Sequence, residues 1–187
     1  MKSKLTNFDM KSGLSPDVKP IQRRLSQMKK MFTDERCRAE MQAKEDMLIY
    51  EFYDMHVPEK AVEVAYGTSI TYPGKVGDEY FMTKGHFHTV LDTAEVYFCI
   101  RGHGYMLMES PEGEVEAQEM KAGGAVYVPG RYAHRSINVS RTEPLVTFFA
   151  FRGDAGHDYG TIESKGFRKL IIEKNGKPAI VDNPRWK

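Results

Sequence analysis

Residues 83–102 read TKGHFHTVLDTAEVYFCIRG, and they carry the strongest structural signal in the chain. His86 and His88 are separated by one residue, and in an extended chain such residues project from the same face. Two imidazoles on one face of a β-segment can bind one divalent metal together, and we call His86 and His88 the histidine claw. Glu95 heads a strand pattern in which it shares one face with Tyr97. Because a carboxylate on a half-apolar face is costly to bury unless it is paired or metal-bound, Glu95 is a third candidate ligand.

A fourth candidate ligand, His134, lies where a Pro-Gly turn leads into another strand, in VPGRYAH, residues 128–134. Three imidazoles and one carboxylate leave open positions on a metal that prefers five or six ligands. Such a mixed nitrogen and oxygen set suits Fe(II), Mn, Ni or Zn, and does not choose among them. The alternative for an isolated His-x-His pair is a set of surface or substrate-binding histidines.

Short β-type runs separated by turn residues continue on both sides of this stretch. The runs cover residues 48–53, 61–72, 79–83, 94–100, 104–109, 114–120, 124–128, 133–139 and 145–151. Near the end of the chain, Asn175-Gly176 stands between two further runs and predicts a hairpin. Nine or more short strands at this spacing predict an all-β closed barrel or a sandwich.

The N-terminal region has a different texture. Residues 1–20 are polar and interrupted by glycine and proline, which predicts an arm along the surface. Apolar side chains then recur at helical spacing and predict a helix over residues 21–32. Thr33-Asp34 is expected to cap a second short helix that runs to about Lys44. We therefore expect an arm, 1–20, and one domain, 21–187, with the metal-binding barrel at about 47–152.

Composition restricts the function classes. The chain has 187 residues, 41% hydrophobic and 28% charged, which fits one globular domain. Its formal charge of +1 provides no global field for nucleic acid or acidic membranes, and no apolar window is long enough to span a bilayer. The N-terminus does not read as a signal peptide, and two cysteines, Cys37 and Cys99, cannot form a disulfide framework. We therefore expect a cytoplasmic protein without nucleic-acid or membrane partners.

The ligand spacing resembles the two motifs of the cupin family. The first motif is matched by His86, His88, Glu95 and Gly102, and the second by Gly123, Pro129, His134 and Asn138. Six residues separate His88 from Glu95, where many cupins have three or four, so a longer turn is implied. Tyr80 and Arg131 stand where glycine is frequent. The resemblance implies a double-stranded β-helix, or jelly-roll barrel, with an N-terminal helical cover and a C-terminal hairpin.

A more specific resemblance runs from about Ile21 to the end of the chain. The strings YPGKVG (72–77), TKGHFH (83–88), AEVY (94–97), DAGHDYGT (154–161) and VDNPRW (181–186) look like the cupin-type glucose-6-phosphate isomerases, known chiefly from archaea. The resemblance implies interconversion of glucose 6-phosphate and fructose 6-phosphate. It also implies one divalent metal per subunit, with Fe(II) preferred, and a homodimer.

The reaction assigns catalytic roles to three residues. Glu95 is placed to act as the base, although a metal-bound carboxylate is a poorer base than a free one. Tyr97 is expected to hydrogen-bond a sugar oxygen, the alternative being a core tyrosine. By resemblance His157 lines the substrate pocket, where it is expected to shuttle protons; the alternative is a loop histidine bonded to its neighbouring carboxylate. Phe151 stands where some relatives have a sugar-contacting tyrosine.

The substrate phosphate requires its own anchor, and the sequence has no P-loop. Thr83 and Gly85 precede the histidine claw and offer a hydroxyl and an unhindered N–H as donors. By resemblance, Tyr50 and Ser69 complete this subsite. Lys84 has a suitable charge, but alternation directs its side chain away from Thr83 and Gly85, as for a solvated lysine.

Three other functions share the predicted metal site. A dioxygenase would use Fe(II) with the same four ligands, and a mannose 6-phosphate or other sugar-phosphate isomerase would differ in the stereochemistry accepted at C2. A non-enzymatic sugar-phosphate-binding cupin would act as a sensor. Oxygen uptake separates the dioxygenase from the others, and turnover separates enzyme from sensor. Whether an isomerase would use an enediol or a hydride shift stays open.

Overall fold

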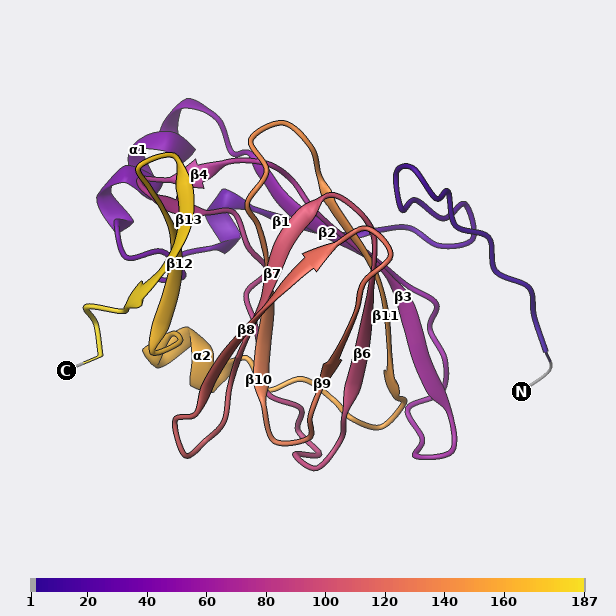
Figure 1. The fold of residues 1–187 in the computed structure, drawn as a ribbon. Coiled ribbons are helices and arrows are strands. Elements are labelled where there is room, and N and C mark those ends of the chain that lie inside the picture. The colour runs from indigo at the N-terminus through magenta and orange to yellow at the C-terminus, as the bar shows by residue number, and fades with distance from the viewer. Residues whose placement is uncertain (1–2, 187) are drawn as a thin grey trace.

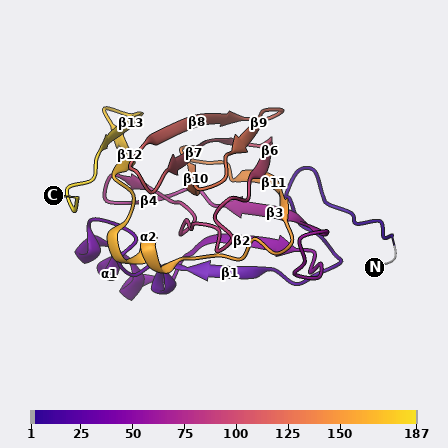
Figure 2. The ribbon, with the colours of Figure 1, turned by 90° about the horizontal axis from the view of Figure 1, so that it is seen from below.

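The computed structural model describes residues 3–186, so the outermost ends of the predicted arm and domain, residues 1–2 and 187, lie outside the described residues. Its larger sheet has the strand order β1 (Ile21–Arg24), β2 (Leu48–Asp54), β3 (Val64–Thr71), β11 (Leu145–Arg152), β6 (Glu95–Arg101) and β9 (Ala125–Val128). A second sheet has the order β10 (Ala133–Asn138), β7 (His103–Glu109) and β8 (Val115–Lys121). The two sheets face each other (Figure 2), and their pairings are antiparallel. The predicted all-β cupin barrel is confirmed.

Alternation along β6 determines which side chains enter the barrel. Glu95 and Cys99 are buried, whereas Val96 and Phe98 are exposed on the outer face. This is the two-residue period of a strand with one face on the core. The strand therefore brings the Glu95 carboxylate into the barrel interior.

β10 differs from β6 because all six of its residues are buried. One face of β10 looks into the barrel, and the other is covered by the segment that precedes the histidine claw and by Phe167. Consecutive residues of this strand therefore lie in two different buried environments, His134 inside the barrel and Arg135 behind it.

A third sheet packs beside the barrel, in the order β13 (Lys177–Asp182), β12 (Lys169–Lys174), β5 (Glu79–Tyr80) and β4 (Lys75–Val76). Asn175 and Gly176 join β12 to β13 with φ of 54° and 75°, so the predicted hairpin is confirmed. The strand expected over residues 79–83 ends early, at Tyr80. Beyond it the chain makes only isolated bridges, of Met82 with Ile137, His86 with His134 and Phe87 with Asp158, and Gly85 among them has φ of 76°.

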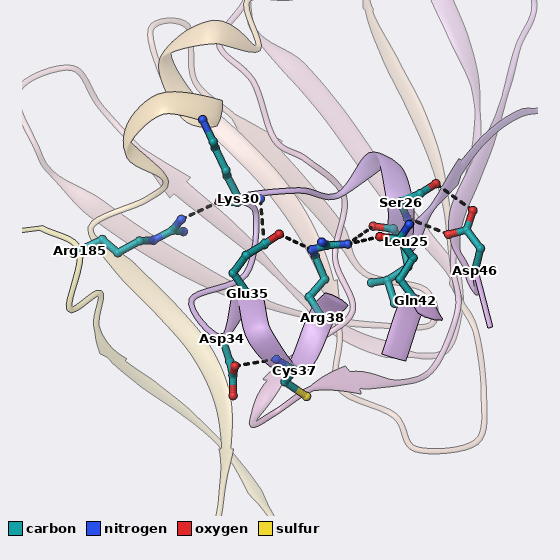
Figure 3. A network of polar contacts seen from close by, with 10 residues as sticks. All are labelled: Leu25, Ser26, Lys30, Asp34, Glu35, Cys37, Arg38, Gln42, Asp46 and Arg185. Atoms are coloured by element: carbon teal, nitrogen blue, oxygen red, sulfur yellow. Dashed lines mark hydrogen bonds and ion pairs between the residues drawn. The ribbon is translucent and has the colours of Figure 1, made fainter. Parts of the chain in front are cut away.

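Helix α1 (Glu35–Lys44) begins as predicted, with the Asp34 carboxylate accepting a hydrogen bond of 2.8 Å from the Cys37 N–H. On its inner side, the buried Arg38 guanidinium donates to Glu35, to Gln42 and to the Leu25 carbonyl (Figure 3). Helices α1 and α2 (Gly160–Lys165) gather with the β12–β13 hairpin at one side of the barrel (Figure 1).

The helix predicted over residues 21–32 is wrong. Ile21–Arg24 forms β1, paired with the edge of β2, and Leu25–Gln27 forms a single 3-10 turn, η1. The apolar side chains that suggested the helix, Leu25, Met28 and Phe32, are indeed buried. Their burial is achieved by an irregular turn, because the backbone upstream satisfies its hydrogen bonds on a sheet edge. A tertiary pairing has overridden a local pattern that helix spacing also fits.

The N-terminal segment before β1 contains no helix or strand in its described part, residues 3–20. It lies against the outer face of the larger sheet, where Thr6 Oγ1 is 2.9 Å from the Tyr66 hydroxyl and Phe8 packs edge-on against Phe148. Neither α1 nor α2, nor any other helix within residues 3–186, has the length and apolarity needed to cross a membrane.

Candidate metal centre and substrate cavity

The four candidate ligands converge inside the barrel. His86 and His88 come from the segment between β5 and β6, Glu95 from the first residue of β6, and His134 from β10. One ligand atom from each residue lies within 4.8 Å of every other. His88, Glu95 and His134 are buried, and His86 is partly open to a cavity. The structure thus brings the whole predicted ligand set together.

The loop between His88 and Glu95 determines how the His88 ring is oriented. The Thr93 hydroxyl donates to the Val90 carbonyl at 2.6 Å, so its oxygen accepts from His88 Nδ1, at 2.8 Å. The Thr93 carbonyl lies 2.9 Å from the same nitrogen. His88 Nδ1 therefore carries the proton, and the lone pair of Nε2 faces Glu95. The six-residue spacing that distinguishes this sequence supplies the residue that sets the tautomer.

The remaining imidazoles leave buried nitrogens without hydrogen-bond partners. His134 Nδ1 lies 3.3 Å from the Tyr132 carbonyl, which accepts its proton. His134 Nε2 then approaches Glu95 Oε2 at 2.9 Å but is not aligned for a hydrogen bond, and His86 Nε2 also has no partner within residues 3–186. Buried polar atoms are normally satisfied. Three imidazole nitrogens and one carboxylate directed at a common point fit a divalent cation, which would satisfy all of them.

The electrostatics of the cluster favour an ionised Glu95 carboxylate beside a neutral His86. Burial opposes ionisation of Glu95, but the imidazoles of His134 and His88 hold the pKa of Glu95 below its ordinary value. Burial, together with His134 and His157, lowers the pKa of His86 well below its ordinary value. Burial also opposes the charged form of His88, yet the nearby negative charge of Glu95 raises the pKa of His88. Glu95 is therefore ionised and His86 neutral, the states in which both bind metal.

We expect Thr93→Val to weaken metal binding about 10–100-fold, because the substitution removes the side-chain acceptor of His88 Nδ1, leaves only the residue 93 carbonyl to orient the ring, and keeps the side-chain shape. Titration of the metal-free protein with Mn(II) or Zn(II) measures the change. Thr89→Val, an exposed threonine in the same loop, is the matched control and is expected to bind metal as the wild type does. Equal metal affinity in the two variants would contradict the role given to Thr93.

A cavity of about 240 Å³ opens above the cluster. Besides His86, Glu95 and His134, its lining includes every other residue predicted to contact substrate, namely Tyr50, Ser69, Thr83, Gly85, Tyr97 and His157. Lys84 also borders the cavity, but its amino group is 2.7 Å from the Glu163 carboxylate on α2. The Lys84 side chain is therefore engaged in an ion pair rather than free in solvent.

One wall of this cavity offers hydrogen-bond donors suited to an anion. The Ser136 N–H donates to Thr83 Oγ1 at 3.1 Å, which leaves the Thr83 hydroxyl proton available to a ligand. Within residues 3–186, the Gly85 N–H has no acceptor. Burial raises the pKa of the Tyr50 hydroxyl, so it stays protonated at neutral pH. Behind the wall, burial lowers the pKa of Arg135 to about 10, and its guanidinium remains charged at neutral pH.

Another part of the cavity lining is aromatic. His157 lies edge-on to His86 with ring centroids 4.3 Å apart, and Phe151 packs against both His88 and His157. Burial lowers the pKa of His157. The neighbouring Asp158 carboxylate accepts from the Gly160 N–H and the Thr161 hydroxyl instead of pairing with His157.

Tyr159 is a cavity residue that sequence reasoning did not single out. Its ring stacks on His157 at 5.9 Å and lies 5.4 Å from His86. The signal was its place two residues after His157 in the same loop, which puts both side chains on one side of an extended segment. Tyr97, on the barrel side, has a pKa raised well above its ordinary value by burial and by the Glu95 carboxylate.

The sequence is similar to those of known proteins along most of its length. The family described as glucose-6-phosphate isomerase matches residues 22–185. The chain is 48% identical over 179 residues to the glucose-6-phosphate isomerase of Pyrococcus furiosus, covering 96% of this chain and 94% of the relative. It is 46% identical over 180 residues to that of Thermococcus litoralis, with the same coverage of both chains.

Among solved structures, an oxalate oxidase in complex with the substrate analogue glycolate has a similar fold. The two share a TM-score of 0.50 and 15% sequence identity, over 61% of this chain and 56% of that chain. At this identity the likeness concerns the barrel fold alone.

Proposed function

This chain belongs to the glucose-6-phosphate isomerase family, and from that membership we propose that it interconverts glucose 6-phosphate and fructose 6-phosphate with the help of a bound divalent metal. The observation that carries the proposal is one cavity with two complementary sides. His86, His134 and Glu95 of the candidate metal cluster border it, together with donors suited to an anion. An open-chain sugar phosphate has reacting oxygens at one end and an anion at the other.

We propose that His86, His88, Glu95 and His134 hold one metal ion per subunit, with Fe(II) preferred. A bound divalent cation supplies Lewis acidity, which stabilises negative charge on the C1 and C2 oxygens of the sugar. Support for a metal comes from the Nε2 atoms of His86 and His134, which have no hydrogen-bond partner among the described residues, 3–186. The mixed nitrogen and oxygen set also suits Mn, Ni and Zn.

Hydrogen and protons must move between C1 and C2 and between their oxygens. Glu95 is a carboxylate that borders the cavity and is our candidate for the base. The imidazole of His157 reaches the same space and can carry a proton between the sugar oxygens, since imidazole exchanges protons near neutral pH. The Tyr97 hydroxyl stays protonated and can donate to a sugar oxygen.

The phosphate subsite we propose consists of the Tyr50 and Thr83 hydroxyls, the Gly85 N–H and Ser69. All four residues border the cavity. Neutral donors directed at a buried anion give strong charge-assisted hydrogen bonds. The aromatic part of the lining, with Phe151 and His157, limits water in the cavity.

A coupled assay of glucose 6-phosphate formation from fructose 6-phosphate tests the proposal. The protein is stripped with a chelator and reloaded separately with Fe(II), Mn, Ni or Zn. We expect activity to disappear on stripping and to return with at least one metal. Metal binding without turnover would overturn the isomerase function, and oxygen uptake would then identify a dioxygenase. Comparison with mannose 6-phosphate defines the stereochemical selectivity.

We further propose a cytoplasmic homodimer. Its support is an apolar outer face of the larger sheet, where Val96 and Tyr127 are paired neighbours and stay 42% and 63% exposed. Phe98 and Val64 extend this face. Contiguous exposed apolar surface of this kind is typical of subunit contacts. Sedimentation equilibrium is expected to give twice the chain mass of 21.4 kDa; a mass of 21.4 kDa would contradict the dimer.

The cytoplasmic location that we propose is supported by the two free thiols, Cys37 and Cys99, which suit a reducing compartment.

A further inference from the structure

Arg135 is a buried charge directly behind the donor wall of the cavity. It follows His134 on β10, is 2% exposed, and points to the face of the strand opposite the metal cluster. Two carboxylates act on it through space, Glu79 and Glu109, but each is bonded elsewhere. Glu79 accepts from Thr33, and Glu109 pairs with Arg168.

The contacts of Arg135 hold the guanidinium without neutralising it. Nη1 donates to the Met82 sulfur at 3.0 Å, and the guanidinium carbon lies 4.5 Å from the centre of the Phe167 ring. Its Nε–H has no hydrogen-bond partner among residues 3–186. Glu79 and Glu109 favour the charge from a distance, but among residues 3–186 no carboxylate forms an ion pair with Arg135. A buried charge without a close ionic partner is costly, so a purely structural role would be better served by an apolar side chain. The cost suggests that an anion completes the arrangement.

One contact of Arg135 acts directly on the donor wall. Nη2 donates a short hydrogen bond to the Lys84 carbonyl. Because the Lys84–Gly85 peptide is planar and trans, its C=O and N–H point in opposite directions. Drawing the Lys84 carbonyl back toward Arg135 therefore turns the Gly85 N–H forward. Gly85 borders the cavity, and its N–H has no protein acceptor within the described chain.

The lack of a side chain at Gly85 allows Arg135 to approach the Lys84–Gly85 peptide closely. Gly85 has φ of 76°, and a Cβ there would come within 3.0 Å of Arg135 Nε and 2.8 Å of the Phe167 ring. The absence of a side chain lets the guanidinium pack against the back of the peptide whose front faces the cavity. The positive charge of Arg135 thus lies behind the peptide, and the positive end of the peptide dipole faces the space that an anion would occupy.

We propose that Arg135 is the positioning residue of the phosphate subsite, clamping the Lys84–Gly85 peptide and placing a positive charge behind it without touching the substrate. This inference rests on the proposed function for the identity of the anion. It places the selectivity of the subsite for an anion over a neutral sugar in a residue outside the cavity lining.

The test compares phosphate binding in matched variants of the metal-loaded protein. Arg135→Met removes the charge and the clamp while preserving volume, and Arg38→Met removes an equally buried arginine in α1 that lines no part of the cavity. Titration calorimetry with inorganic phosphate is expected to show about tenfold or greater weakening in R135M and no change in R38M. In the coupled assay, KM for fructose 6-phosphate should rise by a similar factor, with kcat changed far less. Arg135→Lys should restore part of the affinity.

If R135M does not fold, Arg135→Gln serves the same purpose, since it keeps a donor for the Lys84 carbonyl and removes the charge. A folded R135M or R135Q that binds inorganic phosphate as tightly as the wild type would overturn the inference. Phosphate binding is measured without turnover, so the two proposals fail separately. Phosphate binding that depends on Arg135, in a wild type that turns over no sugar phosphate, would contradict only the isomerase function.

Discussion

Glu95→Ala is expected to lose metal and activity together. The variant removes the one carboxylate among the four candidate ligands and leaves three imidazoles, one of them His88, whose Nε2 faces the vacated position. Loss of a direct ligand should weaken metal binding by more than the 10–100-fold typical of second-sphere changes. With the Lewis acid lost, kcat/KM should fall at least about a thousandfold, or about 4 kcal/mol of transition-state stabilisation. Elemental analysis after dialysis and the coupled assay measure both effects.

The matched control for this variant is Glu51→Gln. Glu51 is also buried on a barrel strand, β2, where its carboxylate accepts from Gln22 and the Tyr72 hydroxyl, away from the cavity. It should keep the metal content and activity of the wild type. A Glu95→Ala protein that retained metal and full turnover would show that the cluster is not the working centre.

Gly67→Ala is expected to destabilise the protein by about 3 kcal/mol or more. Gly67 lies in the middle of the larger sheet, opposite Phe149 on β11, and a Cβ there would fall 1.9 Å from the Tyr53 carbonyl oxygen and 2.8 Å from the Phe149 ring. Neither neighbour can yield easily, because one is backbone and the other is packed against Tyr97. Overpacking of this severity exceeds the usual range for core insertions. The midpoint of thermal unfolding should fall by roughly 6–12 °C for a domain of this size.

The consequence for function follows from the position of Phe149, which borders the substrate cavity. A side chain at Gly67 would push the ring toward the substrate, so KM should rise in whatever protein folds. Gly160→Ala is the control for stability, since a Cβ there meets only the Asp158 carboxylate, at an ordinary 3.4 Å. Equal melting temperatures for the two variants would contradict the packing described for β3.

The sequence predicted the parts of the site whose geometry depends only on residues close together in the chain. His86 and His88 share a face because residues two apart in an extended segment always do, and Glu95 enters the barrel because its strand alternates. Asn175-Gly176 formed its hairpin because both residues accept positive φ. The barrel fold was accessible through its resemblance to the cupin motifs.

Features that depend on tertiary approach were not accessible. Residues 21–32 place apolar side chains at a spacing that fits a helix, and only the free edge of β2 explains why the chain pairs there as a strand. Thr93 and Arg135 have no signature of their own, because their roles arise from what the fold places against them. The ion pair of Lys84 with Glu163 likewise joins segments far apart in the sequence.

The burial of β10 on both faces has a consequence for how the metal is exchanged. Native proteins open in units of different stability, and a strand enclosed on both sides belongs to the most protected unit. His134 is therefore fixed for as long as the molecule stays folded. The loop of residues 89–94 and the segment around His157 are more exposed and can open alone. A cation held at this site would therefore be released through local opening of these loops, while His134 on β10 would stay in place to bind an incoming ion.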